Sequence, residues 1–233
     1  MGDISLKDFD ILSEQDKAEA EALLSRYDQL DKQDVCQKDF MGFVKHMWGD
    51  TFIEGKHHRL IADKFNKIAQ GKLKRLIVCL PPRHTKSEFA STFFPAWMMG
   101  LNGALKIIQC THTAELAVRF GRKVRNLIDS EDFRLIFPEI KLQADNKSAG
   151  RSITGRGADL LIIDDPHSEQ DALSPKSLES AYEWYTSGPR QRLQPGGTIV
   201  IVMTRWSTKD LVGKVIKKQG DDNADQWEVI EFP

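Results

Sequence analysis

A lysine followed by a serine lies between an apolar stretch and the start of an expected helix. In "LIVCLPPRHTKSEFA", residues 76–90, a short loop leads to Lys86 and Ser87. Phosphate-binding loops use backbone N–H groups for phosphate oxygens, a lysine for the β- and γ-phosphates and a hydroxyl for Mg²⁺. The usual G-x-x-x-x-G-K-[ST] pattern would place glycines at Leu80 and Thr85, and both are missing. Taken alone, the Lys-Ser pair also fits an ordinary helix start with a solvated lysine.

Two adjacent carboxylates, Asp164 and Asp165, follow another apolar run in "GADLLIIDDPH", residues 157–167. Ligands of open α/β sheets bind at the carboxyl ends of the strands. One carboxylate can hold the Mg²⁺ shell, and the next can polarise water for in-line attack on a γ-phosphate. The plain alternative is a turn after a strand, since Asp-Pro starts many turns. Together with the earlier Lys-Ser pair, the carboxylates favour a nucleotide site more strongly than either motif alone.

A third candidate is Thr204, which ends the apolar run in "GTIVIVMTRW", residues 197–206. If this strand ends beside the other two, the threonine hydroxyl could sense the γ-phosphate. A strand exit with a polar cap fits the sequence equally well.

The elements that must position these residues alternate along the chain. Short apolar strands are expected at 75–80, 105–111, 159–164, 197–204 and 227–232. Helices are expected at 14–30, 36–48, 57–69, 87–99, 114–129, 175–186 and 207–217, with Ser13 and Ser207 as N-caps. This pattern predicts an α/β fold with a mostly parallel central sheet flanked by helices and an N-terminal helical segment.

Composition limits the classes of protein. The 233 residues are 40% hydrophobic, enough for a substantial core, and their net charge of −1 implies neither a nucleic-acid nor a membrane partner. Residues 1–31 hold nine acids and three bases, so an acidic leader precedes a mildly basic body. Cys36, Cys79 and Cys110 lack ligand-spaced partners and are expected to be buried thiols. No apolar run approaches the roughly 20 residues that span a bilayer.

Four motifs together resemble the ATPase domain of tailed-bacteriophage large terminase subunits, the motors that package DNA into procapsids. They are "LPPRHTKSE", "GRGADLLIIDDP", "RLQPGGTIVIVMTRW" and "KDLVGK", and the segments "DFMGFVKHMW" and "KHHRLIADKF" also fit. The resemblance runs from near Phe40 to the C-terminus. It implies a P-loop NTPase of the ASCE type that hydrolyses ATP with Mg²⁺.

Carried over residue by residue, the resemblance implies a role for each candidate. Lys86 would contact the β- and γ-phosphates, Ser87 would ligate Mg²⁺, and Asp164 would support the metal through water. Asp165 stands where many relatives have a catalytic glutamate, one methylene longer. Thr204 matches the motif that couples the γ-phosphate to subdomain movement. The loop that binds the nucleotide would comprise Pro82, Arg83, His84, Thr85, Lys86, Ser87 and Glu88.

Two arginines are candidates for stabilising charge on the transferred phosphoryl group. Arg83 matches the arginine that such loops often carry and could act in cis. Arg156 precedes the carboxylate strand, where the family places an arginine that reaches a neighbouring subunit's ATP. Arg151 competes with it, and a surface or DNA-facing role stays open for either.

Thr85 is the departure from the family loop, which often reads Pro-Pro-Arg-His-Gly-Lys-Ser. If residue 85 needs a positive φ, threonine costs energy there and ATP binding weakens.

Two further groups have open alternatives. His57 and His58 could lie near the adenine, or could be capping or solvated residues at a helix start. The helix at 114–129 could contact the DNA backbone without reading sequence, or could be simply solvated. Its basic residues are Arg119, Arg122, Lys123 and Arg125.

The expected organisation is an acidic helical segment at 1–35 and a P-loop ATPase domain at 36–233. The chain stops directly after a strand, at Pro233, as if cut from a longer polypeptide, and the family's C-terminal nuclease domain is expected to be absent. The resemblance implies double-stranded DNA, a portal protein and a small terminase subunit as partners. It also implies a homo-oligomeric ring docked on the portal, in the host cytoplasm and away from membranes.

Two other functions remain open. A helicase-like, nucleic-acid-dependent ATPase would use the same site but needs a second motor-like domain in a single chain. A nucleotide-responsive structural module would fit a degenerate loop marked by Thr85.

Overall fold

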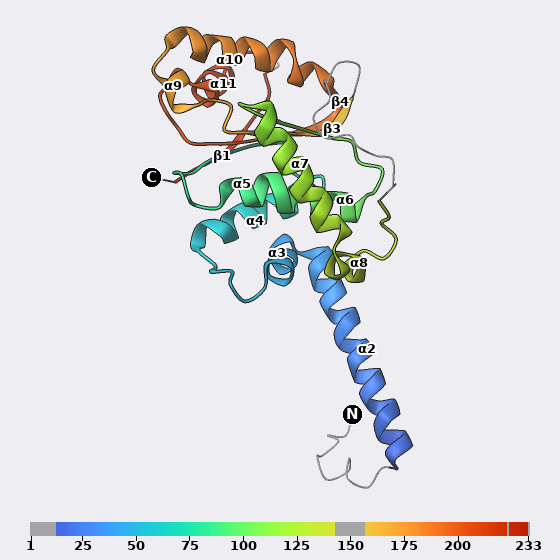
Figure 1. Ribbon diagram of the computed structural model, residues 1–233. Coiled ribbons are helices and arrows are strands. Elements are labelled where there is room, and N and C mark those ends of the chain that lie inside the picture. The colour runs from blue at the N-terminus through green and yellow to red at the C-terminus, as the bar shows by residue number, and fades with distance from the viewer. Residues whose placement is uncertain (1–12, 143–156, 223, 233) are drawn as a thin grey trace.

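A five-stranded parallel sheet forms the centre of the computed structural model, which describes residues 13–142, 157–222 and 224–232 (Figure 1). The strand order is β2-β3-β4-β1-β5, and every neighbouring pair is parallel. The strands are β1 (Arg75–Cys79), β2 (Ile107–Thr111), β3 (Ala158–Asp164), β4 (Leu193–Met203) and β5 (Glu228–Glu231). The all-parallel sheet confirms the predicted α/β fold with a mostly parallel central sheet, and β4 lies between β1 and β3.

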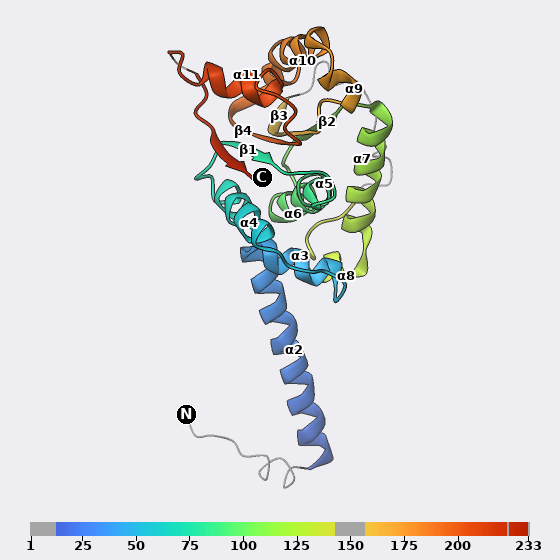
Figure 2. The same cartoon turned by 90° about the vertical axis from the view of Figure 1, so that its left-hand side faces the viewer.

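Helices cover both faces of the sheet, which explains why the central strands are apolar on both sides. Helices α10 (Pro175–Ser187) and α11 (Leu211–Lys218) lie over one face (Figure 1). On the other face lie α4 (Lys56–Ala69), α6 (Phe94–Leu101) and α7 (Ala114–Asp129), as Figure 2 shows from the side. Strand β1 alternates between them: Leu76 and Val78 join one core, and Ile77 and Cys79 join the other.

The helical run after the loop at residues 80–85 is continuous but irregular. It consists of α5 (Lys86–Glu88), a π-helical turn η1 (Phe89–Phe93) and α6. The sequence predicted one regular helix at 87–99. A π turn shifts the register of the side chains that follow it, and such turns are frequent at functional sites.

The N-terminal helices differ in how much they are buried. Ser13 caps α2 (Glu14–Lys38), as predicted, by accepting the N–H of Asp16. Most of α2 extends away from the body of the molecule (Figure 2), and Cys36 is its buried residue. The expected helix boundary at residue 36 was wrong, because α2 continues to Lys38. The backbone of Asp39 is extended, and its side chain accepts the N–H of Gly42. Asp39 therefore caps a separate helix, α3 (Phe40–Trp48).

Several smaller elements were not predicted. They are α8 (Glu131–Ile136), α9 (Glu169–Ala172) and the 3₁₀ turn η2 (Pro189–Arg192). The cap of α11 was assigned to the wrong residue: Asp210, not Ser207, accepts the N–H of Gly213 and begins the helix.

The three cysteines are buried and free, as predicted. Within the described residues, no group of three or more His, Cys, Asp or Glu side chains is arranged to hold a metal ion. None of the described helices combines the length and apolar character needed to cross a membrane.

Candidate nucleotide site at the sheet edge

Three strands bring the predicted residues to one edge of the sheet. Cys79 at the end of β1 is in register with Met203 of β4, and Asp164 at the end of β3 is in register with Val202 of β4. Because β4 lies between β1 and β3, the residue that follows it, Thr204, stands between the loop after β1 and Asp165. The carboxyl ends of the strands therefore meet as the sequence required.

The loop after β1 contains two residues in the left-handed region. Arg83 has φ 65° and Thr85 has φ 58° with ψ 11°. This conformation costs a residue with a side chain about 1 to 2 kcal/mol, whereas glycine adopts it freely. Position 85 is therefore one that favours glycine, and threonine occupies it at an energetic cost.

The loop is suited to phosphate because its N–H groups are available. Among the described residues, no hydrogen bond is donated by a backbone N–H of residues 83–88. The first N–H to bond back into the helical run is that of Phe89, which donates to the carbonyl of Thr85 over 3.0 Å. Convergent N–H groups at the start of a helix bind anions, so the loop fits a polyphosphate.

Lys86 is 7% exposed and points to the strand ends. Its Nζ donates to the Thr204 hydroxyl over 3.0 Å and lies 2.9 Å from Oδ2 of Asp165. The other carboxylate oxygen of Asp165 accepts the N–H of Thr204 over 2.8 Å. The lysine of the loop, the candidate catalytic carboxylate and the candidate coupling threonine thus contact one another.

Asp165 has a constrained backbone, with φ 41°. Its N–H donates to the carbonyl of Val202, and its own carbonyl accepts from Nδ1 of His112 over 3.0 Å. A carbonyl can only accept, so Nδ1 of His112 carries the proton. His112 was not predicted as a site residue, although its place after β2 puts it at the same edge as the carboxylates.

Asp164 is 1% exposed, and each of its carboxylate oxygens accepts a hydrogen bond. It accepts the hydroxyl of Ser87 over 3.0 Å and that of Ser91 over 2.7 Å. Burial raises the pKa of Asp164 to about 6, and the two serine hydrogen bonds oppose that shift. Ser91 was not predicted either, although it follows Ser87 by one helical turn. A hydroxyl beside a carboxylate offers the oxygen ligands that Mg²⁺ prefers, so Ser87 and Asp164 fit the metal role.

The remaining loop residues differ in their surroundings. Pro82, Arg83 and His84 are exposed. Glu88 forms an ion pair with Lys123 of α7, which joins the helix after the loop to its neighbour. Arg151 and Arg156 lie outside the described residues.

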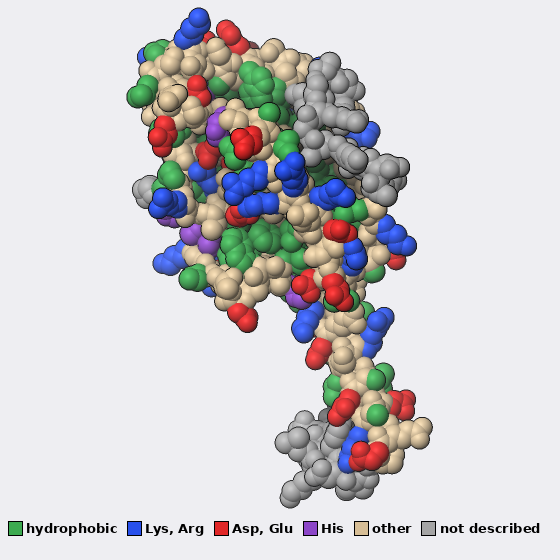
Figure 3. Space-filling view, in the orientation of Figure 1, with side chains coloured by type: hydrophobic (Ala, Val, Ile, Leu, Met, Phe, Trp, Pro, Cys, Tyr) green, Lys and Arg blue, Asp and Glu red, His purple; other side chains and the backbone are tan. Residues whose placement is uncertain are grey.

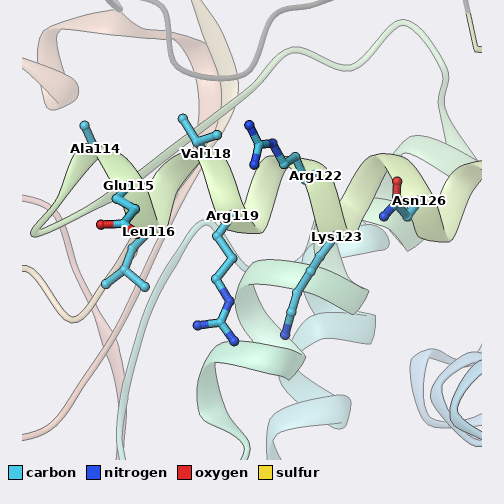
Figure 4. A pocket seen from close by; sticks show the side chains of 8 residues that line it. All are labelled: Ala114, Glu115, Leu116, Val118, Arg119, Arg122, Lys123 and Asn126. Atoms are coloured by element: carbon cyan, nitrogen blue, oxygen red, sulfur yellow. The ribbon is translucent and has the colours of Figure 1, made fainter.

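An open hollow of about 810 Å³ lies along α7 rather than over the loop (Figure 4). Arg119 and Lys123 extend from α7 toward the helical run that starts at the loop, whereas Arg122 points to the other side. Figure 3 shows Lys and Arg side chains gathered over this part of the surface. The helix is therefore basic next to the candidate site, which is compatible with both predicted alternatives, DNA contact and solvation.

His58 is buried against the loop that follows β1. It is 5% exposed, and its Nε2 lies 2.6 Å from the hydroxyl oxygen of Thr85. Its Nδ1 accepts the N–H of Gly55, the N-cap residue of α4. The capping alternative is therefore correct for His58, and the solvated alternative is wrong.

The segment after Thr204 is organised by Asp210, which is 0% exposed. Its Oδ2 accepts the N–H groups of Trp206 and Ser207 and pairs with Arg205. Arg205 also reaches Glu231 of β5 over 3.4 Å. Asp210 and Arg205 thus connect the segment after Thr204 to α11 and to β5. Asp210 was not among the residues predicted from the sequence.

No model of a known protein family matches the sequence, and no curated protein matches it. Two solved structures show partial similarity to the chain. A structure of a DNA replication initiation factor is 14% identical, with a TM-score of 0.42, and AMPPCP-bound DnaA from Aquifex aeolicus is 13% identical, with a TM-score of 0.39. Each similarity covers 79% of this chain and 49% of the other, so the chain spans about half the length of those proteins. Similarity at this level says nothing about what the chain binds or does.

Proposed function

We propose that this chain binds and hydrolyses ATP with Mg²⁺. The observation that carries the proposal is the position of Lys86, within hydrogen-bonding distance of both Thr204 and Asp165 and directly after a loop of available N–H groups. A buried ammonium group, a carboxylate and a hydroxyl at one sheet edge are the groups that phosphoryl transfer to water requires.

The proposed roles follow from the chemistry of each side chain. Lys86 turns from Asp165 to the β- and γ-phosphate oxygens when a nucleotide fills the loop. Asp165 then loses its ion-pair partner and can accept a hydrogen bond from the attacking water. Thr204 keeps the carboxylate oriented through its N–H, and its hydroxyl, released by Lys86, can register the γ-phosphate.

Ser87 and Asp164 are the proposed metal site. Mg²⁺ bound there would neutralise charge on the β- and γ-phosphates during transfer. The Ser87 hydroxyl would bind directly, and Asp164 would act through water.

For the biological task, we propose translocation of double-stranded viral DNA into a procapsid. The support is the resemblance of four ordered motifs to large terminase subunits, together with the basic surface of α7 beside the site. The partners would be double-stranded DNA, a portal protein and a small terminase subunit. The proposed assembly is a homo-oligomeric ring on the portal, in the host cytoplasm. Arg156 is the proposed arginine in trans and Arg83 the one in cis.

The test is phosphate release from ATP with and without Mg²⁺, measured for the wild type, Lys86→Ala and Asp165→Ala. Both variants should lose turnover. Lys214→Ala is the control, since Lys214 is a lysine of α11 that pairs with Glu179 away from the site. Retained turnover in both site variants would contradict the assignment. Stimulation of ATP hydrolysis by portal-bearing procapsids with duplex DNA would support packaging, and strand displacement on a forked duplex would favour the helicase-like alternative.

A second candidate function is a nucleotide-responsive structural module. The closed Lys86–Asp165 pair favours it, because the carboxylate holds the lysine that productive binding of the phosphates needs. ATP binding without phosphate release, even with portal and DNA present, would support this alternative.

A further inference from the structure

We infer that His58 is a positioning residue that holds Thr85 in the left-handed conformation of the phosphate loop and so takes over the role that glycine has in the usual loop. The inference rests on the proposed nucleotide site and deepens it. It concerns how a loop without glycine is kept ready for phosphate.

The partners in this chain of hydrogen bonds determine which group donates in each bond. Gly55 donates its N–H to Nδ1 of His58 over 2.9 Å, so Nδ1 carries no proton and the neutral ring carries it on Nε2. Nε2–H therefore donates to the Thr85 hydroxyl oxygen over 2.6 Å. The Thr85 hydroxyl in turn donates to the carbonyl of His84 over 2.6 Å. A relay from the start of α4 thus ends on the backbone of the loop.

Packing fixes the imidazole in the orientation that this relay needs. The His58 ring stacks on Phe89 with centroids 4.7 Å apart and an interplanar angle of 22°. Phe52 lies against it at 5.1 Å. Phe89 also donates its N–H to the Thr85 carbonyl, so Thr85 is held on both its side chain and its backbone.

The electrostatic environment keeps the ring neutral. Burial, and next the adjacent His57, lower the pKa of His58 to about 4. The neutral tautomer that accepts at Nδ1 and donates at Nε2 is therefore the one present at neutral pH.

The same contacts argue against a nucleotide base as the partner of His58. Both ring nitrogens are already bonded, and Phe89 occupies one face of the ring. His58 acts through Thr85 rather than on the ligand.

The contribution of His58 depends on residue 85 being a threonine. A residue with a Cβ disfavours the left-handed region, so without His58 the loop would leave the binding conformation for part of the time. The apparent affinity falls in proportion to the fraction of loops that are competent to bind. Glycine at position 85 has no such preference, and the contribution of His58 to binding should then disappear.

The experiment is a double-mutant cycle in the full chain, read as the dissociation constant of ADP with Mg²⁺ by titration calorimetry. His58→Phe keeps the ring packing and removes the donor, and His58→Gln keeps an N–H donor near the position of Nε2. Each is measured with Thr85 and in the Thr85→Gly background. With Thr85, His58→Phe should raise the dissociation constant about tenfold and His58→Gln should restore most of the affinity. In the Thr85→Gly background, His58→Phe should have no effect.

Equal losses in the two backgrounds, or no loss in either, would overturn the inference. If the wild type bound no ADP, the proposed function would fail instead. The unfolding free energies of the same variants would still decide the inference, because coupling between residues 58 and 85 is required there and additivity would contradict it.

Discussion

The ammonium group of Lys86 lies 2.9 Å from Oδ2 of Asp165, so the lysine of the candidate phosphate loop and the candidate catalytic carboxylate neutralise each other. Lys86 is buried and Asp165 is partly exposed. A buried charge needs a partner, so in the proposed function phosphate oxygens would take the place of the carboxylate when the pair opens. Binding of the phosphates and release of the carboxylate would then be linked.

That link predicts separate effects of Asp165→Asn on turnover and on binding. Asparagine keeps an oxygen for the Thr204 N–H but no longer competes for Lys86. Phosphate release should fall by about 10²- to 10⁴-fold. The affinity for ADP with Mg²⁺ should stay unchanged or rise. Glu179→Gln, in a carboxylate that pairs with Lys214 away from the site, is the matched control. A parallel loss of ADP binding in Asp165→Asn would show that the carboxylate acts only to shape the site.

Ser91 should contribute to stability through Asp164. Ser91→Ala removes the hydroxyl that donates to Oδ2 of Asp164 over 2.7 Å, in a region closed to solvent. A hydrogen bond to a charged group contributes about 1.5 to 3 kcal/mol, so the free energy of unfolding in urea should fall by about 2 kcal/mol. Thr92→Val is the control on the next residue, since the Thr92 hydroxyl is buried without a partner among the described residues and its removal should be neutral or stabilising. Equal destabilisation by both variants would contradict the role of Ser91.

Asp210 should be required for the segment after Thr204 to hold its shape. Asp210→Ala leaves the N–H groups of Trp206 and Ser207 without an acceptor and Arg205 without its buried partner. Removing one member of a buried ion pair costs about 3 to 5 kcal/mol, and unfolding in urea should shift accordingly. Glu231→Gln removes the other, exposed partner of Arg205 and should cost less than about 1 kcal/mol. Similar costs for both variants would show that Asp210 is no more important than a surface carboxylate.

The folded protein should lose stability in acid partly through His58. Its pKa is lowered from 6.5 to about 4 in the folded state, so between these values the unfolded chain binds more protons. Stability therefore falls as the pH is lowered from 7 toward 4. The titratable groups that shift His58 are His57, Glu54 and His84. They remain in His58→Phe, whose unfolding free energy should fall less steeply over the same pH range. Identical pH dependence of the two proteins would exclude a buried neutral His58.

The residues that could do chemistry were readable from the sequence because their signal is local. Apolar runs followed by Lys86-Ser87, Asp164-Asp165 and Thr204 predict strands with polar groups beyond their carboxyl ends, and the structure brings those groups into contact. Helix boundaries were predicted less well, as the wrong cap assignment at Ser207 shows. Hydrogen-bonding residues near a helix start compete for the cap, and the burial of Asp210 decides in its favour.

Ser91, His112 and His58 mark the limit of prediction from the sequence. Capping was one of the predicted alternatives for His58, but nothing local in the sequence identifies the groups that these three side chains contact. Their partners are Asp164, the carbonyl of Asp165 and Thr85, which are distant in sequence and adjacent only once the parallel sheet has formed.

The sequence by itself determined the chemical groups and the period of the elements that carry them, because side-chain type and hydrophobic periodicity are properties of neighbouring residues. Only the tertiary structure decided that β4 lies between β1 and β3, that Thr85 is left-handed, and that Lys86 is paired with Asp165. Strand order and loop closure depend on contacts between residues far apart in the chain, so no local pattern specifies them.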